Sequence, residues 1–249
     1  MTSYLAERTK KTKVTKRFFA KILFLAVGVF IAILVSGITV SAMPLSRKII
    51  VLDAGHGGWD PGMVQGKTEE KHINLSIVQK LQTFLEQGGA TVIITRVDDS
   101  ELSKTKSGDM QVRRLIANTS HADIFVSIHQ NAFSKSNVKG AQVFYFNESD
   151  NSMKLATCVQ SRLREFVDPS NKFKAKANSN YFVLKQTSMP AVLVECGFLT
   201  NSSERNKLLN ETYQEKIAWG IYLGIIDYFN PPVPEGGTAA FRRLHALTS

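Results

Sequence analysis

Cysteine is scarce in this chain of 249 residues, which contains only Cys158 and Cys196. Two cysteines cannot form a disulfide framework, and their wide separation is unlike the close spacing of cysteine ligands in structural zinc modules. We therefore expect free, buried thiols, with a single disulfide between the two as the alternative. The scarcity excludes the small disulfide-rich secreted folds.

Proline is also sparse, with 7 residues against 16 glycines, and hydrophobic residues make up 43% of the sequence. This composition is typical of globular proteins and excludes collagen-like and low-complexity chains. The length suits one medium domain or two small ones, large enough to bury a hydrophobic core. No internal repeat is present.

Charge is absent from residues 22–40, an almost wholly apolar stretch long enough to cross a bilayer as a helix. Its basic flank, residues 1–21, is expected in the cytoplasm by the positive-inside rule, with the rest of the chain exported. The stretch is longer than a usual secretory signal, which favours an uncleaved anchor, and the flanking charge disfavours a buried core helix. The small residues of "VSA" leave secretion after cleavage behind Ala42 as the alternative. The basic residues of the flank, opposed only by Glu7, are Arg8, Lys10, Lys11, Lys13, Lys16, Arg17 and Lys21.

The net charge of +10 is therefore concentrated in the N-terminal segment, and we expect no nucleic-acid partner. The expected organisation has four parts. A basic cytoplasmic tail (1–21) precedes a membrane anchor or signal segment (22–42), an exported domain (43–230) and a Pro/Gly-rich flexible tail (231–249), in which His245 is no ligand candidate.

Beyond residue 43, apolar strand patterns alternate with amphipathic helix patterns. This alternation predicts a single α/β domain with a mostly parallel central sheet and helices on both faces. Loops are expected at 97–109 and 168–180, the second basic and solvated. Strands are expected at 48–52, 90–96, 122–129, 141–146 and 191–198, and helices at 69–87, 110–120, 151–167, 202–209 and 212–229.

Three polar residues stand at the carboxyl ends of three expected strands. His56 follows the first strand in "LDAGHGG", His129 closes "ADIFVSIH", and Glu195 stands near the end of "AVLVECGF". Open α/β sheets bind ligands at this edge, so the three side chains together favour a site. Taken singly, His129 could be a hydrogen-bonded core histidine, and Glu195 could pair with a buried arginine such as Arg96 or Arg113.

Two imidazoles and one carboxylate form the usual shell of a catalytic zinc, with a fourth position left for water. Zinc lowers the pKa of that water, and a second carboxylate can accept its proton. Thr68 is the expected N-cap of the helix at 69–87, where the helix dipole favours an ionised acid. The residues thus predict a zinc hydrolase and leave its substrate open. The candidate carboxylates are Asp53, Asp60, Glu69, Glu70 and Glu195.

The motifs "LDAGHGG", "EEKHINL", "SIHQNA" and "VLVECGFLTN", in this order, resemble the zinc-dependent N-acetylmuramoyl-L-alanine amidases of bacterial cell-wall metabolism, the amidase-3 family. The likeness runs from about residue 48 to residue 229. It implies that His56, Glu70 and His129 bind zinc and that Glu195 is the catalytic base. Glu70, and not Glu69, matches the family's zinc-binding glutamate. The Lys, Asn and Leu that follow Glu70 stand at the same distances from it as in the family's motif.

The resemblance implies hydrolysis of the amide between the lactyl group of N-acetylmuramic acid and L-alanine in peptidoglycan. The chain departs from the family pattern at Ala54, at Cys196 and at His72, and His72 is expected near enough to the site to perturb metal binding. None of these departures removes a ligand. A zinc peptidase that acts on stem peptides, or an inactive wall-binding protein, are the alternatives.

Within the family, the bare catalytic domain behind a short apolar segment resembles the germination-specific branch, as do "GAQVFYF" and "IYLGIIDYF". That branch implies cortex modification leading to muramic-δ-lactam in spores, and a protein activator as a further partner. The expected location is the outer face of the cytoplasmic or forespore membrane. Vegetative wall turnover or cell separation is the alternative role.

Overall fold

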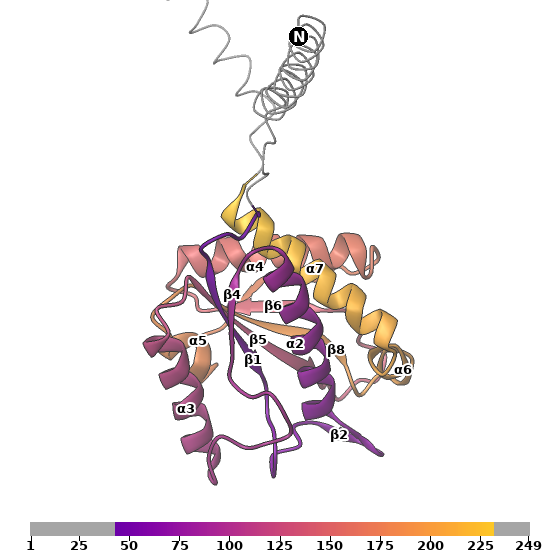
Figure 1. Cartoon of the computed structure of the whole chain (residues 1–249). Coiled ribbons are helices and arrows are strands. Elements are labelled where there is room, and N and C mark those ends of the chain that lie inside the picture. The colour runs from indigo at the N-terminus through magenta and orange to yellow at the C-terminus, as the bar shows by residue number, and fades with distance from the viewer. Residues whose placement is uncertain (1–42, 232–249) are drawn as a thin grey trace, which may run out of the picture. The chain divides into compact units, whose positions relative to one another are not determined.

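The structure is a computed structural model that describes residues 43–231 (Figure 1). The chain divides into two units, Met1–Ala42 and Met43–Ser249. Within residues 43–231, no helix is long and apolar enough to cross a membrane. The expected membrane segment at 22–40 and almost all of the expected tail lie outside the described residues.

Six strands form one sheet in the order β4-β1-β5-β8-β6-β7. The central strands β1 (Ile49–Ala54), β5 (Ile124–Asn131) and β8 (Ala191–Phe198) are parallel, and β4 (Thr91–Ile94) extends them in the same sense. Strand β6 (Gln142–Tyr145) runs antiparallel to β8, and the short edge strand β7 (Lys176–Ala177) is parallel to β6. The expected single α/β domain with a mostly parallel sheet is confirmed.

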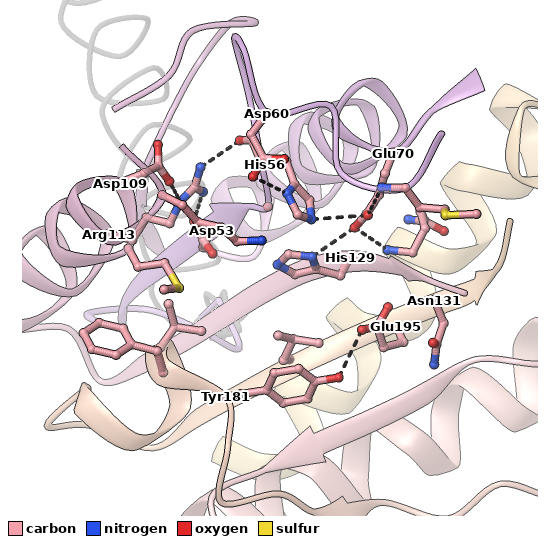
Figure 2. Close-up of a pocket in the computed structure, with 18 of the residues that line it drawn as sticks. Asp53, His56, Asp60, Glu70, Asp109, Arg113, His129, Asn131, Tyr181 and Glu195 are labelled. Carbon is pink, nitrogen blue, oxygen red and sulfur yellow. Dashed lines mark hydrogen bonds and ion pairs between the residues drawn. The ribbon is translucent and has the colours of Figure 1, made fainter. Parts of the chain in front are cut away.

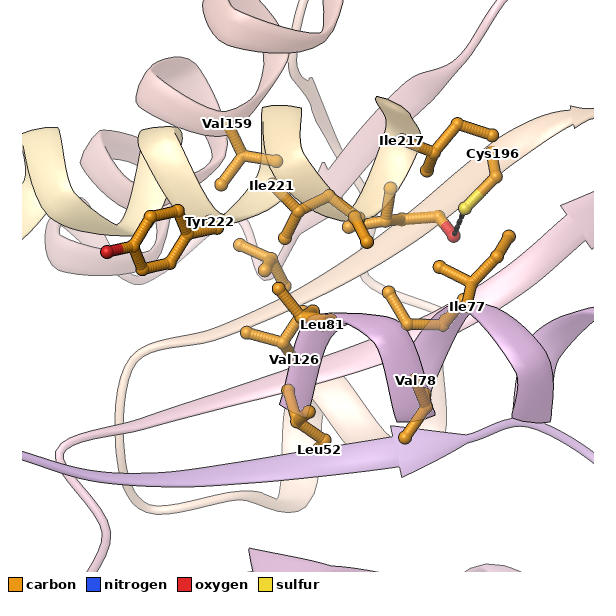
Figure 3. Packing of buried hydrophobic residues seen from close by; sticks show 14 of the residues in the cluster. Leu52, Ile77, Val78, Leu81, Val126, Val159, Cys196, Ile217, Ile221 and Tyr222 are labelled. Carbon is orange, nitrogen blue, oxygen red and sulfur yellow. Dashed lines mark hydrogen bonds between the residues drawn. The ribbon is translucent and has the colours of Figure 1, made fainter. Parts of the chain in front are cut away.

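Helices cover both faces of the sheet, as expected (Figure 1). On one face lie α2 (Glu70–Gln87), α4 (Asp150–Phe166) and α7 (Glu211–Phe229). On the other lie α3 (Lys106–Thr119) and α5 (Phe182–Gln186), and α6 (Ser202–Leu208) follows β8. Figure 3 shows the larger core, in which α2 and α7 bury their apolar side chains against Leu52 and Val126 of the sheet.

Side-chain alternation along the central strands decides where polar residues can gather. Val51, Phe125 and Leu193 belong to the smaller core beneath α3 and α5, whereas their strand neighbours Leu52 and Val126 face the larger core. Because residues two apart on a strand share a face, the polar residues that follow point to the same side. These residues, all at the carboxyl ends of the strands, are Asp53, Ser127, His129 and Glu195.

Two local expectations were wrong. Helix α3 begins four residues earlier than expected because the Thr105 side chain accepts a hydrogen bond from Gly108 N at 3.1 Å and caps it. Thr68 does not cap α2: it pairs with Gln65 in a small hairpin of β2 (Val64–Gln65) and β3 (Thr68–Glu69), and Glu69 occupies the cap position without a side-chain bond. Helix α5 and this hairpin were not expected.

Candidate active site

The loop after β1 brings His56 to the carboxyl edge of the sheet in an uncommon backbone conformation. Its φ is +63°, in the left-handed region that costs a non-glycine residue about 1 kcal/mol or more. Gly55 is required by a close approach, because a methyl group there would lie 2.2 Å from Cε1 of His129. The imidazole rings of His56 and His129 stand edge to face with their centroids 5.0 Å apart.

Two carboxylates orient the His56 ring. Nδ1 lies 2.8 Å from Oδ2 of Asp60, and Nε2 lies 3.2 Å from Oε2 of Glu70. Asp60 is itself held by a hydrogen bond from Gly62 N. Burial lowers the pKa of His56, but the hydrogen bonds and charges of Glu70 and Asp60 outweigh it and raise the pKa to about 8.

Glu70 opens α2 and is only 4% exposed, yet its carboxylate is well satisfied. Oε1 accepts hydrogen bonds from Gln130 N at 3.0 Å and Asn74 Nδ2 at 3.1 Å, and Oε2 accepts one from Met63 N at 2.8 Å. Burial would raise the pKa of Glu70, but His129, whose Nδ1 lies 3.0 Å from Oε1, and the His56 ring hold it well below its usual range. Glu70 is therefore a buried anion.

His56, Glu70 and His129 each offer one ligand atom, and these atoms lie within 4.8 Å of one another (Figure 2). Among residues 43–231, this is the one group of His, Cys, Asp or Glu residues arranged closely enough to hold a metal ion. Glu69 stands apart, 3.5 Å from Lys71 Nζ and 3.2 Å from the exposed ring of His72. The structure thus brings together the three ligands that the resemblance implied.

Glu195 lies opposite His129 in the pairing of β8 with β5, and 7% of it is exposed. The Tyr181 hydroxyl donates to its Oε1 at 3.4 Å, while its Oε2 is buried with no hydrogen-bond partner. Burial, reinforced by the charge of Glu70, raises the pKa of Glu195 to about 7, although His129 opposes the shift. A carboxylate with a free oxygen and a pKa near neutrality is suited to proton transfer.

The alternative role for Glu195 as an ion-pair partner of a buried arginine is wrong. The guanidinium group of Arg113 pairs with Asp53 and Asp109. That of Arg96 donates all of its hydrogen bonds to backbone carbonyl oxygens. Asp53, one of the candidate carboxylates, therefore serves this buried pair and is not near enough to join the metal group.

A cavity of about 360 Å³ contains the metal group and Glu195 (Figure 2). Toward α3 and α5 the lining combines the apolar residues Met110, Phe182, Val183 and Leu193 with the charged residues Lys106, Asp109 and Arg113. Other lining residues, among them Met63, Asn131 and Ala132, come from the hairpin side of His56 and from the end of β5.

Three contributors were missed by the sequence reasoning: Asp60 as the partner of His56, Asn74 as a donor to Glu70, and Tyr181 as a donor to Glu195. The spacing of Asn74 four residues after Glu70 on a helix was a usable signal. Nothing in the sequence pairs Tyr181 with Glu195, since α5 was not expected. Both thiols are free, with Cys196 buried on β8 and Cys158 half-buried on α4.

Comparison with known proteins adds independent information. Residues 50–227 match the protein family described as N-acetylmuramoyl-L-alanine amidase. The germination-specific N-acetylmuramoyl-L-alanine amidase of Bacillus subtilis is 38% identical over 196 residues, which cover 76% of this chain and 82% of the relative. The amidase LytC of the same organism is 32% identical, over 75% of this chain and 36% of the relative.

Solved structures of similar fold include two bacterial amidases. The CwlD amidase from Clostridioides difficile, in complex with the GerS lipoprotein, is 44% identical with a TM-score of 0.73, over 75% of this chain and 100% of that one. The catalytic domain of CwlV from Bacillus (Paenibacillus) polymyxa is 32% identical with a TM-score of 0.65, over 74% of this chain and 99% of that one.

Proposed function

This chain belongs to the N-acetylmuramoyl-L-alanine amidase family, and we propose that it hydrolyses the amide between N-acetylmuramic acid and L-alanine in peptidoglycan with a zinc ion held by His56, Glu70 and His129. One observation carries the proposal. The three candidate ligands gather within 4.8 Å in the same cavity as Glu195, a carboxylate with an unpartnered oxygen. An amide hydrolase needs this combination of a metal site and a base.

The residues present fit zinc by the chemistry of their donors. Two imidazole nitrogens and one carboxylate oxygen match a catalytic zinc site. The hydrogen bond from His56 Nδ1–H to Asp60, 2.8 Å long, is the outer-shell contact that metal-binding histidines usually make, and it leaves Nε2 available as a ligand. Glu70 brings a negative charge that favours a divalent cation.

When bound, zinc supplies activation of the attacking water and polarisation of the scissile carbonyl. The carboxylate of Glu195, which lines the same cavity, would accept a proton from the attacking water and pass it to the departing nitrogen of L-alanine. Tyr181 donates to Oε1 at 3.4 Å, which keeps the carboxylate oriented. Burial of Glu195, which is 7% exposed, limits the access of bulk water to its carboxylate.

The biological role that we propose is modification of the spore cortex, where removal of stem peptides precedes formation of muramic-δ-lactam. The Bacillus subtilis relative is named germination-specific, and the Clostridioides difficile relative is a CwlD amidase. Since the latter was solved with the GerS lipoprotein, we include a lipoprotein activator as a partner of this chain. Anchoring through residues 22–40 on the outer face of the membrane, or secretion after Ala42, belongs to the same proposal.

Digestion of purified peptidoglycan by the full chain with zinc, followed by mass spectrometry, tests the reaction. An amidase frees peptides with an L-alanine amino terminus and leaves muramyl glycan intact, whereas a stem peptidase shortens the peptides. Deletion of the gene tests the role, because spores should then lack muramic-δ-lactam. Chained vegetative cells with normal cortex would instead assign the enzyme to cell separation.

A further inference from the structure

Two buried guanidinium groups hold the backbone of the loop that carries His56. Arg96 donates from Nε to the carbonyl oxygen of Ala54 at 2.9 Å and from Nη2 to that of Gly55 at 3.1 Å. Arg113 donates from Nη1 to the Ala54 oxygen at 2.8 Å and from Nη2 to the His56 oxygen at 2.7 Å. Three consecutive carbonyls thus accept hydrogen bonds from the arginine pair, Arg96 and Arg113.

The same pair reaches the helix that carries Glu70. Nη2 of Arg96 also donates to the carbonyl oxygen of Lys71 at 2.8 Å. One planar group therefore joins the His56 loop to the first turn of α2. A guanidinium offers several donors in a rigid fork, so the two backbone segments are fixed relative to each other as well as singly.

The orientation of Arg113 is itself fixed. Its Nη1 lies 2.5 Å from Oδ1 of Asp53, and its Nε lies 2.5 Å from Oδ1 of Asp109. Asp53 also accepts hydrogen bonds from Thr95 at 2.8 Å and Ser127 at 2.6 Å. With its charge opposed by two carboxylates, the guanidinium can be buried at 4% exposure, and it has little freedom to turn away from the loop.

These hydrogen bonds explain how the His56 backbone keeps its left-handed conformation. A left-handed histidine persists only where its surroundings impose that conformation, and the hydrogen bond from Arg113 to the His56 carbonyl is such a constraint. The hydrogen bonds that orient the His56 loop are all made by protein groups. We propose that Arg113 and Arg96 are positioning residues that hold His56 and Glu70 in ligand geometry before metal binds, so that their contribution appears as zinc affinity. The inference rests on the zinc site proposed above.

The test compares three variants of the full chain: Arg113→Lys, Arg96→Lys and, as a matched control, Arg114→Lys. Lysine keeps the charge and loses the fork. Arg114 neighbours Arg113 on α3, but its guanidinium donates only to the Gln111 side chain. Zinc dissociation constants are measured by competition with a chromophoric chelator, and the fold of each metal-free protein is checked by circular dichroism.

We expect zinc binding to weaken about 10- to 100-fold in the first two variants, as for other outer-shell contacts of metal ligands, and to stay unchanged in Arg114→Lys. At saturating zinc, kcat should return to within a few-fold of wild type, because the pair acts before metal binds. If Arg113→Lys does not fold, Arg96→Lys decides the question alone.

Folded variants that bind zinc as tightly as wild type would overturn the inference, whatever their kcat at saturating zinc. Failure of the wild-type chain to bind zinc at all is a different result, since it would remove the proposed zinc site itself. The two failures are therefore distinguishable in one titration series.

Discussion

Replacing Glu195 by glutamine should greatly reduce turnover while changing stability in a pH-dependent way. The amide cannot accept a proton, so kcat is expected to fall by a factor of about 10² to 10⁴ with zinc retained. The folded-state pKa of Glu195 is about 7 against an ordinary value of 4.5. The folded protein therefore binds this proton more tightly than the unfolded chain does, and ionisation of Glu195 destabilises the fold.

The sign and size of the stability effect follow from those two values. In metal-free wild type, the stability contribution of protonated Glu195 is fully present below pH 4.5 and is lost as the pH rises to about 7. The difference of about 2.5 pKa units corresponds to about 3 kcal/mol at 1.36 kcal/mol per unit. The glutamine variant lacks this loss, so its stability relative to wild type should rise by up to about 3 kcal/mol between pH 4.5 and pH 8.

Urea unfolding of both proteins with a chelator present, at pH 4.5 and pH 8, measures this difference. The pH-independent cost of a buried amide cancels when the two pH values are compared. Glu204 is the matched control: it is also buried at 6% exposure, but its oxygens accept hydrogen bonds from Gly140 N at 2.8 Å and Phe198 N at 2.7 Å. Glu204→Gln should destabilise at pH 8, because an amide NH₂ would face a backbone donor. Equal pH dependence in wild type and Glu195→Gln would refute the reasoning.

Three other experiments test the remaining parts of the site. His129→Ala should lose both zinc and activity, and stoichiometric zinc retained by that protein would show that His129 is not a ligand. Zinc binding to the metal-free protein at pH 7 should release a proton from His56, whose pKa is about 8, so the apparent affinity should rise with pH up to about 8; calorimetry in buffers of different ionisation enthalpy measures this release. Asp53 has a pKa lowered to about 2, because Arg113 and its hydrogen bonds outweigh burial. Its contribution of about 2 kcal/mol, present above pH 3.8, should be lost as the pH falls through 2, so Asp53→Asn should destabilise at pH 7 and much less at pH 2 in chemical denaturation.

The sheet and the site edge could be predicted from the sequence because both follow from local patterns. The buried strands at 49–54, 124–131 and 191–198 are short, nearly continuous apolar runs rich in Val, Ile and Leu, as parallel strands covered on both faces usually are. A histidine or glutamate at the end of such a run must lie at the carboxyl edge. The choice of Glu70 over Glu69, in contrast, came only from resemblance, since adjacent residues at a helix start cannot be ranked by spacing.

The missed features depend on contacts between distant segments. Tyr181 approaches Glu195 because α5 packs on β8 through Val183 and Leu184, and a helix of five residues carries too little periodicity to be recognised in sequence. The early start of α3 was concealed because its first turn is polar, with Thr105 as the cap. Hydrophobic periodicity detects the buried part of a helix and overlooks an exposed first turn.

The pairing of His129 with Glu195 on adjacent parallel strands has a consequence for how this enzyme can diversify. The spacing of neighbouring strands is set by backbone hydrogen bonds near 4.8 Å and changes little under perturbation. The distance between a ligand and the base is thereby built into the least deformable part of the molecule. Cavity-lining residues that the reacting groups do not use, such as Met63, Met110 and Ala132, can then change to accept different wall polymers while the distance between His129 and Glu195 is kept.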